Sequence, residues 1–283
     1  MVSVSDDTVL LRRRNDQGLF APDQDTAFVD EVIPHERLAE IRTARLWAPS
    51  DDPIERLPEV IAQMPNLTSL TISGGGARPS MVAELREGDL PDALEELRVL
   101  SEQGRVLAWP DGLVLPRLTS LFVSDVLRFD AAAFPHLRRL SITPDRALAN
   151  VREGLQLPLD DLNLLRLPLD EQVFDLVSTR PLRHLGLISG TKLSSLNGIQ
   201  SLIDLESLRL KNLRALSDIS ALGELPDLRR LDIQYCRRLS SIDVLADLPA
   251  LARLTLVGCG EVGLAAIQDV IDRIPVTTIG ATT

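Results

Sequence analysis

The chain contains the phrase LRHLGL at residues 182–187, LESLRL at 205–210, LRRLDI at 228–233 and LARLTL at 251–256. Each copy begins 23 residues after the previous one. Because successive side chains of a strand point to opposite faces, the phrase places Leu208 and Leu210 on an inner face and Arg209 on the outer face. A unit repeated at a fixed period is typical of a solenoid, in which each copy stacks on its neighbours.

A second apolar series follows each phrase at a spacing of three residues. In three successive repeats its members are Leu193, Leu196, Ile199 and Leu202, then Leu216, Ile219, Leu222 and Leu225, then Leu239, Ile242, Leu245 and Leu248. Residues three apart share a face in 3₁₀ and short α-helical turns, so we expect a convex return built from such turns. No repeat buries this face alone, and the core therefore depends on stacking.

Looser copies of the phrase precede the regular ones. They begin at residues 41, 67, 94, 118, 137 and 159. Leu162 is an alternative start for the last of these, and we prefer Leu159 because it stands 23 residues before Leu182. A period of 20 to 29 residues with this phrase describes a leucine-rich repeat. We therefore predict an α/β fold, a leucine-rich repeat solenoid of about ten repeats, with a curved parallel sheet on the concave face, short helices and 3₁₀ turns on the convex face, and a cap at each end.

The spacing of the phrases divides the chain into three parts. We expect an N-terminal cap over 1–40, repeats over 41–260 that are irregular in 41–181 and regular in 182–258, and a C-terminal capping helix and short strand over 261–283. Terminal segments of a solenoid cover its exposed core and are polar outside, which suits these two flanks.

The N-terminal cap carries turn chemistry between two apolar runs. Residues 9–11 and 19–20 are apolar, and the polar residues 15–18 between them include Asn15 and Gly18. This pattern predicts a strand, a turn and a second strand, with the arginines at 12–14 on the solvated face of the hairpin.

Three further segments carry local signals. Residues 54–64 place apolar side chains on one face and predict a convex helix, and residues 261–274 predict an amphipathic helix that closes the C-terminal end. The triplet Gly74–Gly76 predicts either a flexible loop over the concave rim or a relaxed turn. A phosphate-binding loop is disfavoured because no Lys-Ser or Lys-Thr follows.

The formal net charge is −11 and the sequence pI is 4.8, which opposes general nucleic-acid binding because affinity for phosphates requires clustered basic residues. The N-terminus lacks the basic and apolar regions of a signal peptide, and no apolar run of 18 residues follows. We therefore expect a cytoplasmic protein that binds no nucleic acid and no membrane. The sequence carries no indication of the oligomeric state.

The two cysteines, Cys236 and Cys259, stand 23 residues apart and so occupy the same slot of consecutive repeats. Neighbouring strands lie roughly 4.8 Å apart, within reach of a disulfide, but parallel side chains and a cytosolic location favour two free buried thiols. A disulfide stays the alternative. A metal site requires more ligands than two thiols.

The sequence places no catalytic group beside another. Neither His35, His136 nor His184 is spaced to meet a second ligand or a nucleophile, and the many carboxylates fit a solvated surface. We therefore expect a protein that is not an enzyme and that holds no cofactor and no metal.

The stretch from Leu228 to Ile242 resembles the leucine-rich repeats of bacterial proteins of the internalin and phosphatase-regulator type, and the cysteine slot is similar to that of the cysteine-containing subclass. The resemblance implies a protein-binding surface on the concave strands and no particular partner. The asparagine that often caps the strand loop is absent, since the ninth slot holds Gly190, Leu213, Cys236 and Cys259. No asparagine ladder is expected.

The outward slots of the phrase predict the binding face. Its candidate residues are Arg45, Trp47, Arg98, Phe122, His184, Arg209, Lys211, Arg230, Asp232, Gln234, Tyr235 and Arg253, with Leu100, Asp125, Arg139, Asn163 and Ile188 in further outward slots. Aromatic side chains near arginine are typical of interface hot spots, although each aromatic here also has a plain packing role as its alternative. A basic stripe on neighbouring strands, which favours an acidic partner surface, consists of Arg209, Lys211, Arg230 and Arg253.

These features predict a non-catalytic scaffold that binds a protein partner through its concave face. Two narrower hypotheses stay open: an immunity protein that neutralises a toxin, and a regulatory subunit of a signalling enzyme such as a phosphatase.

Overall fold

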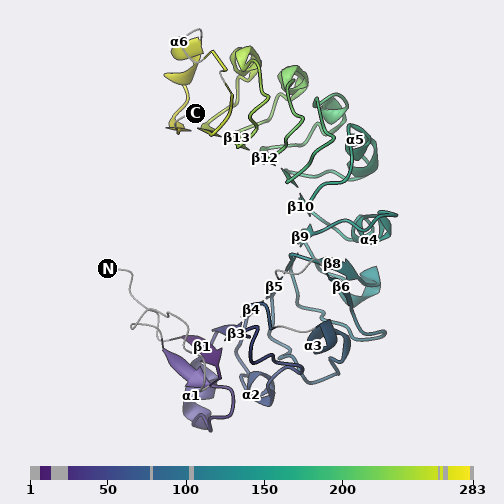
Figure 1. The fold of residues 1–283 in the computed structure, drawn as a ribbon, viewed down its shortest axis with the longest axis vertical. Helices are drawn as coiled ribbons and strands as arrows, with labels where there is room; N and C mark the ends of the chain where they lie inside the picture. The colour runs from purple at the N-terminus through teal and green to yellow at the C-terminus, as the bar shows by residue number, and fades with distance from the viewer. Residues whose placement is uncertain are drawn as a thin grey trace. The chain divides into compact units, whose positions relative to one another are not determined.

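The computed structural model describes residues 7–13, 25–76, 79–101, 105–260, 262–263 and 267–280. The chain forms two compact units (Figure 1). The first comprises Met1–Asp145 with Gln156–Pro158, and the second comprises Arg146–Leu155 with Leu159–Thr283.

The first unit is built on seven parallel strands in the order β2-β1-β3-β4-β5-β7-β9. Their bounds are Thr26–Phe28 (β2), Thr8–Arg12 (β1), Thr43–Trp47 (β3), Ser69–Ser73 (β4), Glu96–Leu100 (β5), Ser120–Val123 (β7) and Arg139–Ile142 (β9). The strands β6 (Val106–Ala108) and β8 (Val126–Arg128) form a separate parallel pair. The connecting segments contain α1 (His35–Glu40), α2 (Glu59–Ala62), α3 (Pro79–Ala83) and the 3₁₀ turn η1 (Ala131–Ala133).

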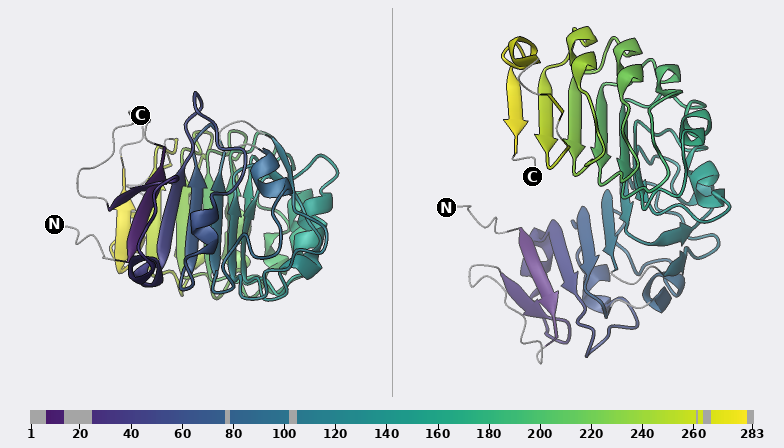
Figure 2. Two further views of the ribbon diagram at one scale, coloured as in Figure 1. Left: turned by 90° about the horizontal axis from the view of Figure 1, so that it is seen from below. Right: turned by 45° about the horizontal axis from the view of Figure 1, so that its top comes forward.

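In the second unit each strand from β10 to β15 pairs in parallel with the next strand along the chain. The strands are Asp161–Leu165 (β10), His184–Ile188 (β11), Ser207–Lys211 (β12), Arg230–Gln234 (β13), Arg253–Val257 (β14) and Val276–Ile279 (β15). The returns contain α4 (Ala149–Gly154), α5 (Gln172–Val177), η2 (Ile199–Ser201), η3 (Ser220–Glu224), η4 (Asp243–Asp247) and α6 (Gln268–Ile271). In this unit the short helices lie on the side of the sheet away from its exposed face (Figure 2).

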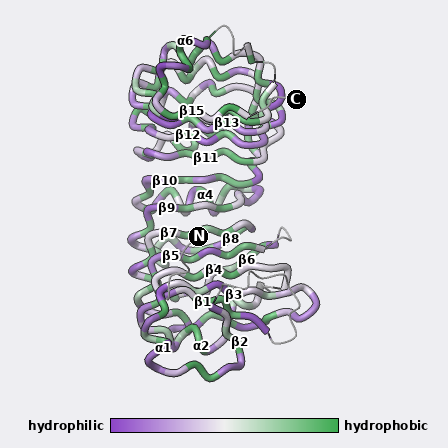
Figure 3. Tube along the Cα trace, turned by 90° about the vertical axis from the view of Figure 1, so that its left-hand side faces the viewer, coloured by the Kyte–Doolittle hydropathy of each residue, from purple (hydrophilic) through white to green (hydrophobic). Residues whose placement is uncertain are grey.

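The predicted strand phrases are confirmed. Each of the ten predicted copies carries a strand that begins two residues after its opening residue, as Leu205 precedes β12 at Ser207. The start at Leu159 is also confirmed, because Leu162 and Leu164 are buried whereas Leu165 is partly exposed. Hydrophobic and hydrophilic residues alternate along these strands, as period-two burial requires (Figure 3). The architecture is that of a leucine-rich repeat solenoid.

The convex series predicted for the regular repeats is buried throughout. Leu193, Leu196, Ile199 and Leu202, with their equivalents in the next two repeats, are at most 5 % exposed. The turns that carry them include the 3₁₀ elements η2 to η4, because a spacing of three residues matches the 3₁₀ period.

The predicted N-terminal hairpin is wrong, because β1 pairs in parallel with two other strands. Residues 10–12 of β1 pair in parallel with β2 and residues 8–11 pair in parallel with β3, so between them both edges of β1 are occupied. Arg12 and Arg13 lie at the end of β1, while the expected turn at 15–18, the expected strand at 19–20 and Arg14 lie outside the described residues.

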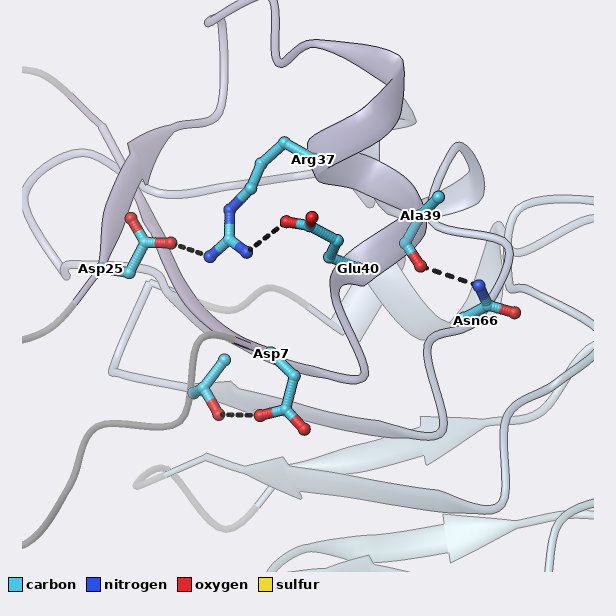
Figure 4. Close-up of polar contacts among 7 residues, drawn as sticks. Asp7, Asp25, Arg37, Ala39, Glu40 and Asn66 are labelled. Atoms are coloured by element: carbon cyan, nitrogen blue, oxygen red, sulfur yellow. Dashed lines mark hydrogen bonds and ion pairs between the residues drawn. The ribbon is translucent and has the colours of Figure 1, made fainter.

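Polar contacts join α1 to the segments around it (Figure 4). The guanidinium of Arg37 on α1 lies between the carboxylates of Asp25 and Glu40, and its hydrogen bond to Asp25 is the main cause that raises the pKa of Arg37. Asn66 Nδ2 donates to the carbonyl oxygen of Ala39 at 2.7 Å. Helix α1 is therefore tied both to the segment before β2 and to the turn before β4.

Two predicted helices are shorter than expected. Within 54–64 the helix covers only Glu59–Ala62, because Pro58 precedes it and keeps the preceding chain extended. Ile54 and Met64 are nevertheless buried. At the C-terminal end, α6 covers Gln268–Ile271 of the predicted 261–274, and Leu264 lies outside the described residues.

The glycine triplet forms a packed turn. A Cβ at Gly74 would lie 2.2 Å from the carbonyl oxygen of Ala48, and one at Gly76 would lie 1.8 Å from that of Pro49. The amide of Gly76 donates to the carbonyl oxygen of Ala48 at 2.9 Å. The triplet therefore allows two backbone segments to approach closely, which fits a turn packed on the chain after β3.

Candidate functional site

The exposed face of the second unit carries three rows of outward side chains in register. The pairing aligns His184, Ser207, Arg230 and Arg253 in one row, Asn163, Gly186, Arg209, Asp232 and Thr255 in the second, and Ile188, Lys211 and Gln234 in the third. The parallel register brings together residues that lie 23 positions apart in the sequence. Seven of the predicted binding residues, from His184 to Arg253, stand in these rows.

A hollow of about 210 Å³ opens on this face. Its lining comprises Asp161, Asn163, His184, Leu185, Ser207, Arg209, Arg230 and Asp232. Gly186 lies between Asn163 and Arg209 in the second row. Because glycine has no side chain, this row has a gap at β11. A Cβ there would lie 2.0 Å from Asn163 Oδ1, which shows that the Asn163 side chain crosses the backbone of β11. We call this depression the Gly186 hollow.

Hydrogen bonds and one ion pair hold the walls of the Gly186 hollow. Arg209 Nε lies 3.1 Å from Asp232 Oδ2, and Gln234 Nε2 donates to Asp232 Oδ1 at 2.8 Å. On the other wall, Asn163 Nδ2 donates to Asp161 Oδ1 at 2.7 Å. The charge of Arg209 is thus largely neutralised within the sheet.

Not all four residues of the predicted basic stripe carry charge that is available to a ligand. Arg230 and Arg253 are direct neighbours on β13 and β14, both are exposed, and among the described residues neither forms an ion pair with a carboxylate. Arg209 is paired with Asp232, and Lys211 lies at the end of β12. Positive charge available to a ligand on this face therefore lies at Arg230 and Arg253 and, at the end of β12, at the exposed Lys211.

The remaining predicted residues lie in the first unit. Arg45 and Trp47 are on β3, Arg98 is on β5 and Phe122 is on β7. The guanidinium of Arg98 stacks over the Phe122 ring at 4.7 Å from its centroid, a cation–π contact between in-register neighbours. This contact supports the packing alternative for Phe122, since one face of the ring is already covered. Trp47 is partly buried.

Asp125 is not an outward residue, contrary to the prediction. Its side chain is fully buried and its Oδ1 accepts a hydrogen bond from the amide of Arg105 at 3.1 Å. The reason is the inserted pair β6 and β8, because the chain turns inward after β7 to enter β8 at Val126.

The eighth slot of the phrase has a left-handed backbone in five consecutive repeats. Its residues are Arg166, Ser189, Asn212, Tyr235 and Gly258, with φ between 51° and 62°. Tyr235, predicted as an outward aromatic, is 47 % exposed, and a Cβ at Gly258 would lie 2.6 Å from its Cδ1. Sequence reasoning missed this conformation, although Asn212 and Gly258 in the same slot could have indicated it.

Both cysteines lie in the buried ninth slot, and both thiols are free. Cys236 Sγ lies 3.6 Å from the carbonyl oxygen of Gln234, and Cys259 Sγ lies 3.6 Å from that of Ile233. Burial raises the pKa of Cys236 to about 11 and also raises that of Cys259. The thiols are therefore protonated at neutral pH and act as small apolar side chains.

A second hollow, of about 470 Å³, lies in the first unit beside β6 and β8. Trp109 and Phe129 contribute to its lining, and the Trp109 ring packs edge-on against Phe134 with centroids 4.8 Å apart. Trp109 Nε1 donates to the carbonyl oxygen of Leu113 at 2.8 Å. These contacts account for Trp109 and Phe134 as parts of the local core. No periodic pattern in the sequence indicates the inserted strand pair.

Within the described part of the chain, no group of three or more His, Cys, Asp or Glu side chains is arranged to hold a metal ion. In the same residues no helix is both long and apolar enough to cross a membrane.

Known structures resemble this chain at low sequence identity. An internalin of Listeria monocytogenes is 16 % identical, with 89 % of this chain and 85 % of that chain covered and a TM-score of 0.41. Internalin C2 of the same species is 16 % identical over 80 % and 84 %, with a TM-score of 0.37. A leucine-rich repeat protein of Leptospira interrogans is 17 % identical over 89 % and 82 %, with a TM-score of 0.34. No family model and no curated protein sequence matches the chain.

Proposed function

We propose that the protein is a non-catalytic, cytoplasmic interaction module that binds a protein partner through the exposed strands β11 to β14. The observation that supports this best is the Gly186 hollow, whose rim carries the exposed residues His184 and Arg230. A hollow of about 210 Å³ accepts one or two side chains of a partner and is too open and small to enclose a typical ligand, whose sites range from roughly 300 to 1,000 Å³.

The charges at the hollow favour an acidic partner surface. Arg230 and Arg253 lie side by side without a carboxylate partner among the described residues, in a chain whose net charge is −11. Neighbouring like charges on a surface repel each other, and a partner carboxylate relieves that repulsion while steering association.

We also propose that residues 1–40 and 261–283 act as caps of repeats 41–260. The support is that β1 pairs with β3 and β15 pairs with β14, so each flank adds a strand beside a repeat strand. Such a strand covers backbone groups that an open sheet edge leaves unpaired.

The experiment that tests this function is site-specific photo-crosslinking. A photoreactive residue replaces His184 on the exposed strand face or Gln200 on the convex turn η2, and both variants are incubated with the native lysate. We expect one discrete cross-linked protein from position 184 and none from position 200. Cross-linking only from position 200 would contradict the concave surface.

The charge hypothesis has a separate test on the captured protein. The variant Arg230→Glu/Arg253→Glu should bind it about tenfold more weakly or worse, with a smaller dependence on salt. A matched variant, Arg86→Glu/Arg117→Glu, makes the same change of net charge at exposed residues of the first unit. Equal loss in both variants would show that only net charge matters.

A further inference from the structure

Beyond the strand face, a second surface of the same unit carries unneutralised positive charge. A groove of about 700 Å³ lies where the chain leaves β11, β12 and β13. Its lining includes Lys211, Asn212, Arg214, Tyr235, Arg237 and Arg238. We call it the rim groove.

The cations of the rim groove form no ion pair within the part of the chain that the structure describes. Lys211, Arg214, Arg237 and Arg238 are all exposed, and among the described residues none of them forms an ion pair with a carboxylate. By contrast, Arg183 and Arg209 in the same repeats pair with Glu206 and Asp232. Four like charges around one hollow repel each other, so the arrangement favours an anionic ligand.

The backbone beneath these cations is fixed before any ligand binds. The amides of Ser189, Asn212 and Tyr235 donate to Lys211, Gln234 and Val257 carbonyl oxygens at 2.7 to 2.8 Å, each bond linking one repeat to the next. The left-handed conformation at these three positions turns the chain sharply out of each strand. A rigid rim lowers the entropic cost of binding at this surface.

Tyr235 gives the groove its one aromatic wall. The residue keeps a bulky side chain at φ 57°, where L-residues other than Gly, Asn and Asp are disfavoured by about 1–2 kcal/mol, and it remains 47 % exposed. The same left-handed conformation occurs in this slot of the neighbouring repeats, so it is a property of the repeat. What Tyr235 adds to the groove is an aromatic ring that stays accessible to a ligand.

We propose that the rim groove binds an acidic peptide segment of a protein partner. Its cations come from two consecutive repeats and its lining spans three, so the groove is roughly 10 Å long at a strand spacing of about 4.8 Å. That length fits about three residues of extended chain, and the Tyr235 ring fits the aliphatic part of a glutamate or a neighbouring apolar side chain. A small inorganic anion uses neither the length nor the ring.

Tyr235 is the only tyrosine of the chain, which allows a direct test. Protein labelled with 3-fluorotyrosine reports on the rim groove alone by fluorine NMR. Titration with a capped oligoglutamate peptide should shift the signal saturably, and the shift should weaken as salt rises. Oligoglutamine of the same length should leave it unchanged.

Charge-reversal variants test whether the oligoglutamate peptide binds at the rim groove. Arg214→Glu/Arg237→Glu/Arg238→Glu should weaken oligoglutamate binding about tenfold or more, whereas Arg86→Glu/Arg117→Glu/Arg146→Glu, with the same change of net charge, should stay within about twofold. If the first variant misfolds, Arg237→Gln/Arg238→Gln provides the milder loss of charge.

Three outcomes would overturn the proposal. They are the absence of a saturable shift, equal weakening in the rim and control variants, and binding of tripolyphosphate without binding of oligoglutamate. The last would assign the groove to small anions. Because the titration needs no native partner, its result stands apart from that of cross-linking at position 184.

Discussion

Arg166 and Asn212 occupy the same left-handed slot two repeats apart, at φ 51° and 54°. Asparagine tolerates this region, whereas a long side chain there costs about 1 kcal/mol. Arg166 is exposed, so its replacement removes little packing. We expect Arg166→Asn to raise the free energy of unfolding by about 0.5–1 kcal/mol.

The reciprocal substitution is the control. Asn212→Arg should lower the free energy of unfolding by a similar amount, with a small added loss from the 3.4 Å contact between Asn212 Nδ2 and Ser189 Oγ. Urea unfolding of both variants checks the pair. Changes of the same sign in the two variants would show that backbone strain does not decide stability at this slot.

Gly186 leaves room for the Asn163 side chain, which lines the hollow. In Gly186→Ala the new Cβ meets Asn163 Oδ1 at 2.0 Å, so the Asn163 side chain must move and lose its bond to Asp161. We expect weaker partner binding together with a change in unfolding free energy within about 1 kcal/mol, because alanine itself suits a strand better than glycine.

A double-mutant cycle separates the steric clash between the new Cβ and Asn163 from the higher strand propensity of alanine. In an Asn163→Ala background, Gly186→Ala should be more favourable by about 1 kcal/mol than it is in the native sequence. Additive effects in urea unfolding would indicate that Asn163 does not cross the strand.

At the scale of the element, Glu171 links the start of α5 to the next repeat. Its Oε1 accepts hydrogen bonds from the amides and hydroxyls of Ser194 and Ser195 at 2.8–3.2 Å. Burial raises the pKa of this carboxyl, but the hydrogen bonds from the two serines outweigh it and lower the pKa to about 2. The charged form is therefore the one that the fold stabilises.

This shift predicts a pH dependence. Because the folded pKa, about 2, lies below the ordinary 4.5, the stabilisation is complete above pH 4.5 and declines as the pH falls toward 2. Glu171→Gln should lower the unfolding free energy at pH 7 by about 1 kcal/mol, a figure reduced for partial solvent exposure, and the difference should shrink below pH 4.5. Urea unfolding between pH 3 and 7 measures it, with the exposed Glu224→Gln as control. A difference that is constant with pH would contradict this role.

The same scale shows why the strands and the regular returns were predictable whereas the irregular returns of the first unit were not. A strand such as β12 follows from alternation alone, since Leu208 and Leu210 must share the inner face. The helix expected over 54–64 has the right buried residues, but Pro58 restricts the preceding backbone and limits it to Glu59–Ala62. The pair β6 and β8 contains only three residues in each strand, too few for a periodic signal.

The sequence predicted which residues lie on the exposed strand face. It did not predict which of their charges are neutralised by neighbouring side chains. Register alone aligned Arg209 with Asp232. Which arginine is neutralised depends on side-chain geometry, and the Gly186 hollow depends on how Asn163 folds across β11, neither of which a pattern of residue types contains. The rim groove was missed because its arginines follow the strands and lie outside the outward slots of the phrase.

At the scale of the molecule, stacked repeats open from their ends. In a solenoid each repeat contacts only its neighbours, so local opening of the last layers costs less free energy than opening of inner ones. Cys259 follows β14, which pairs with β15, the last described strand, whereas Cys236 follows β13 and lies one repeat further inside. The two free thiols therefore report on successive layers.

Native-state thiol labelling tests this order. In the single-cysteine variants Cys236→Ala and Cys259→Ala, labelling at low urea should be about tenfold faster at Cys259 than at Cys236, with a smaller dependence on urea because less surface is exposed. Both thiols are buried and have raised pKa values, so reaction requires opening. Equal rates with equal urea dependence would mean that the second unit opens only as a whole, because end fraying and global unfolding differ in the surface that they expose.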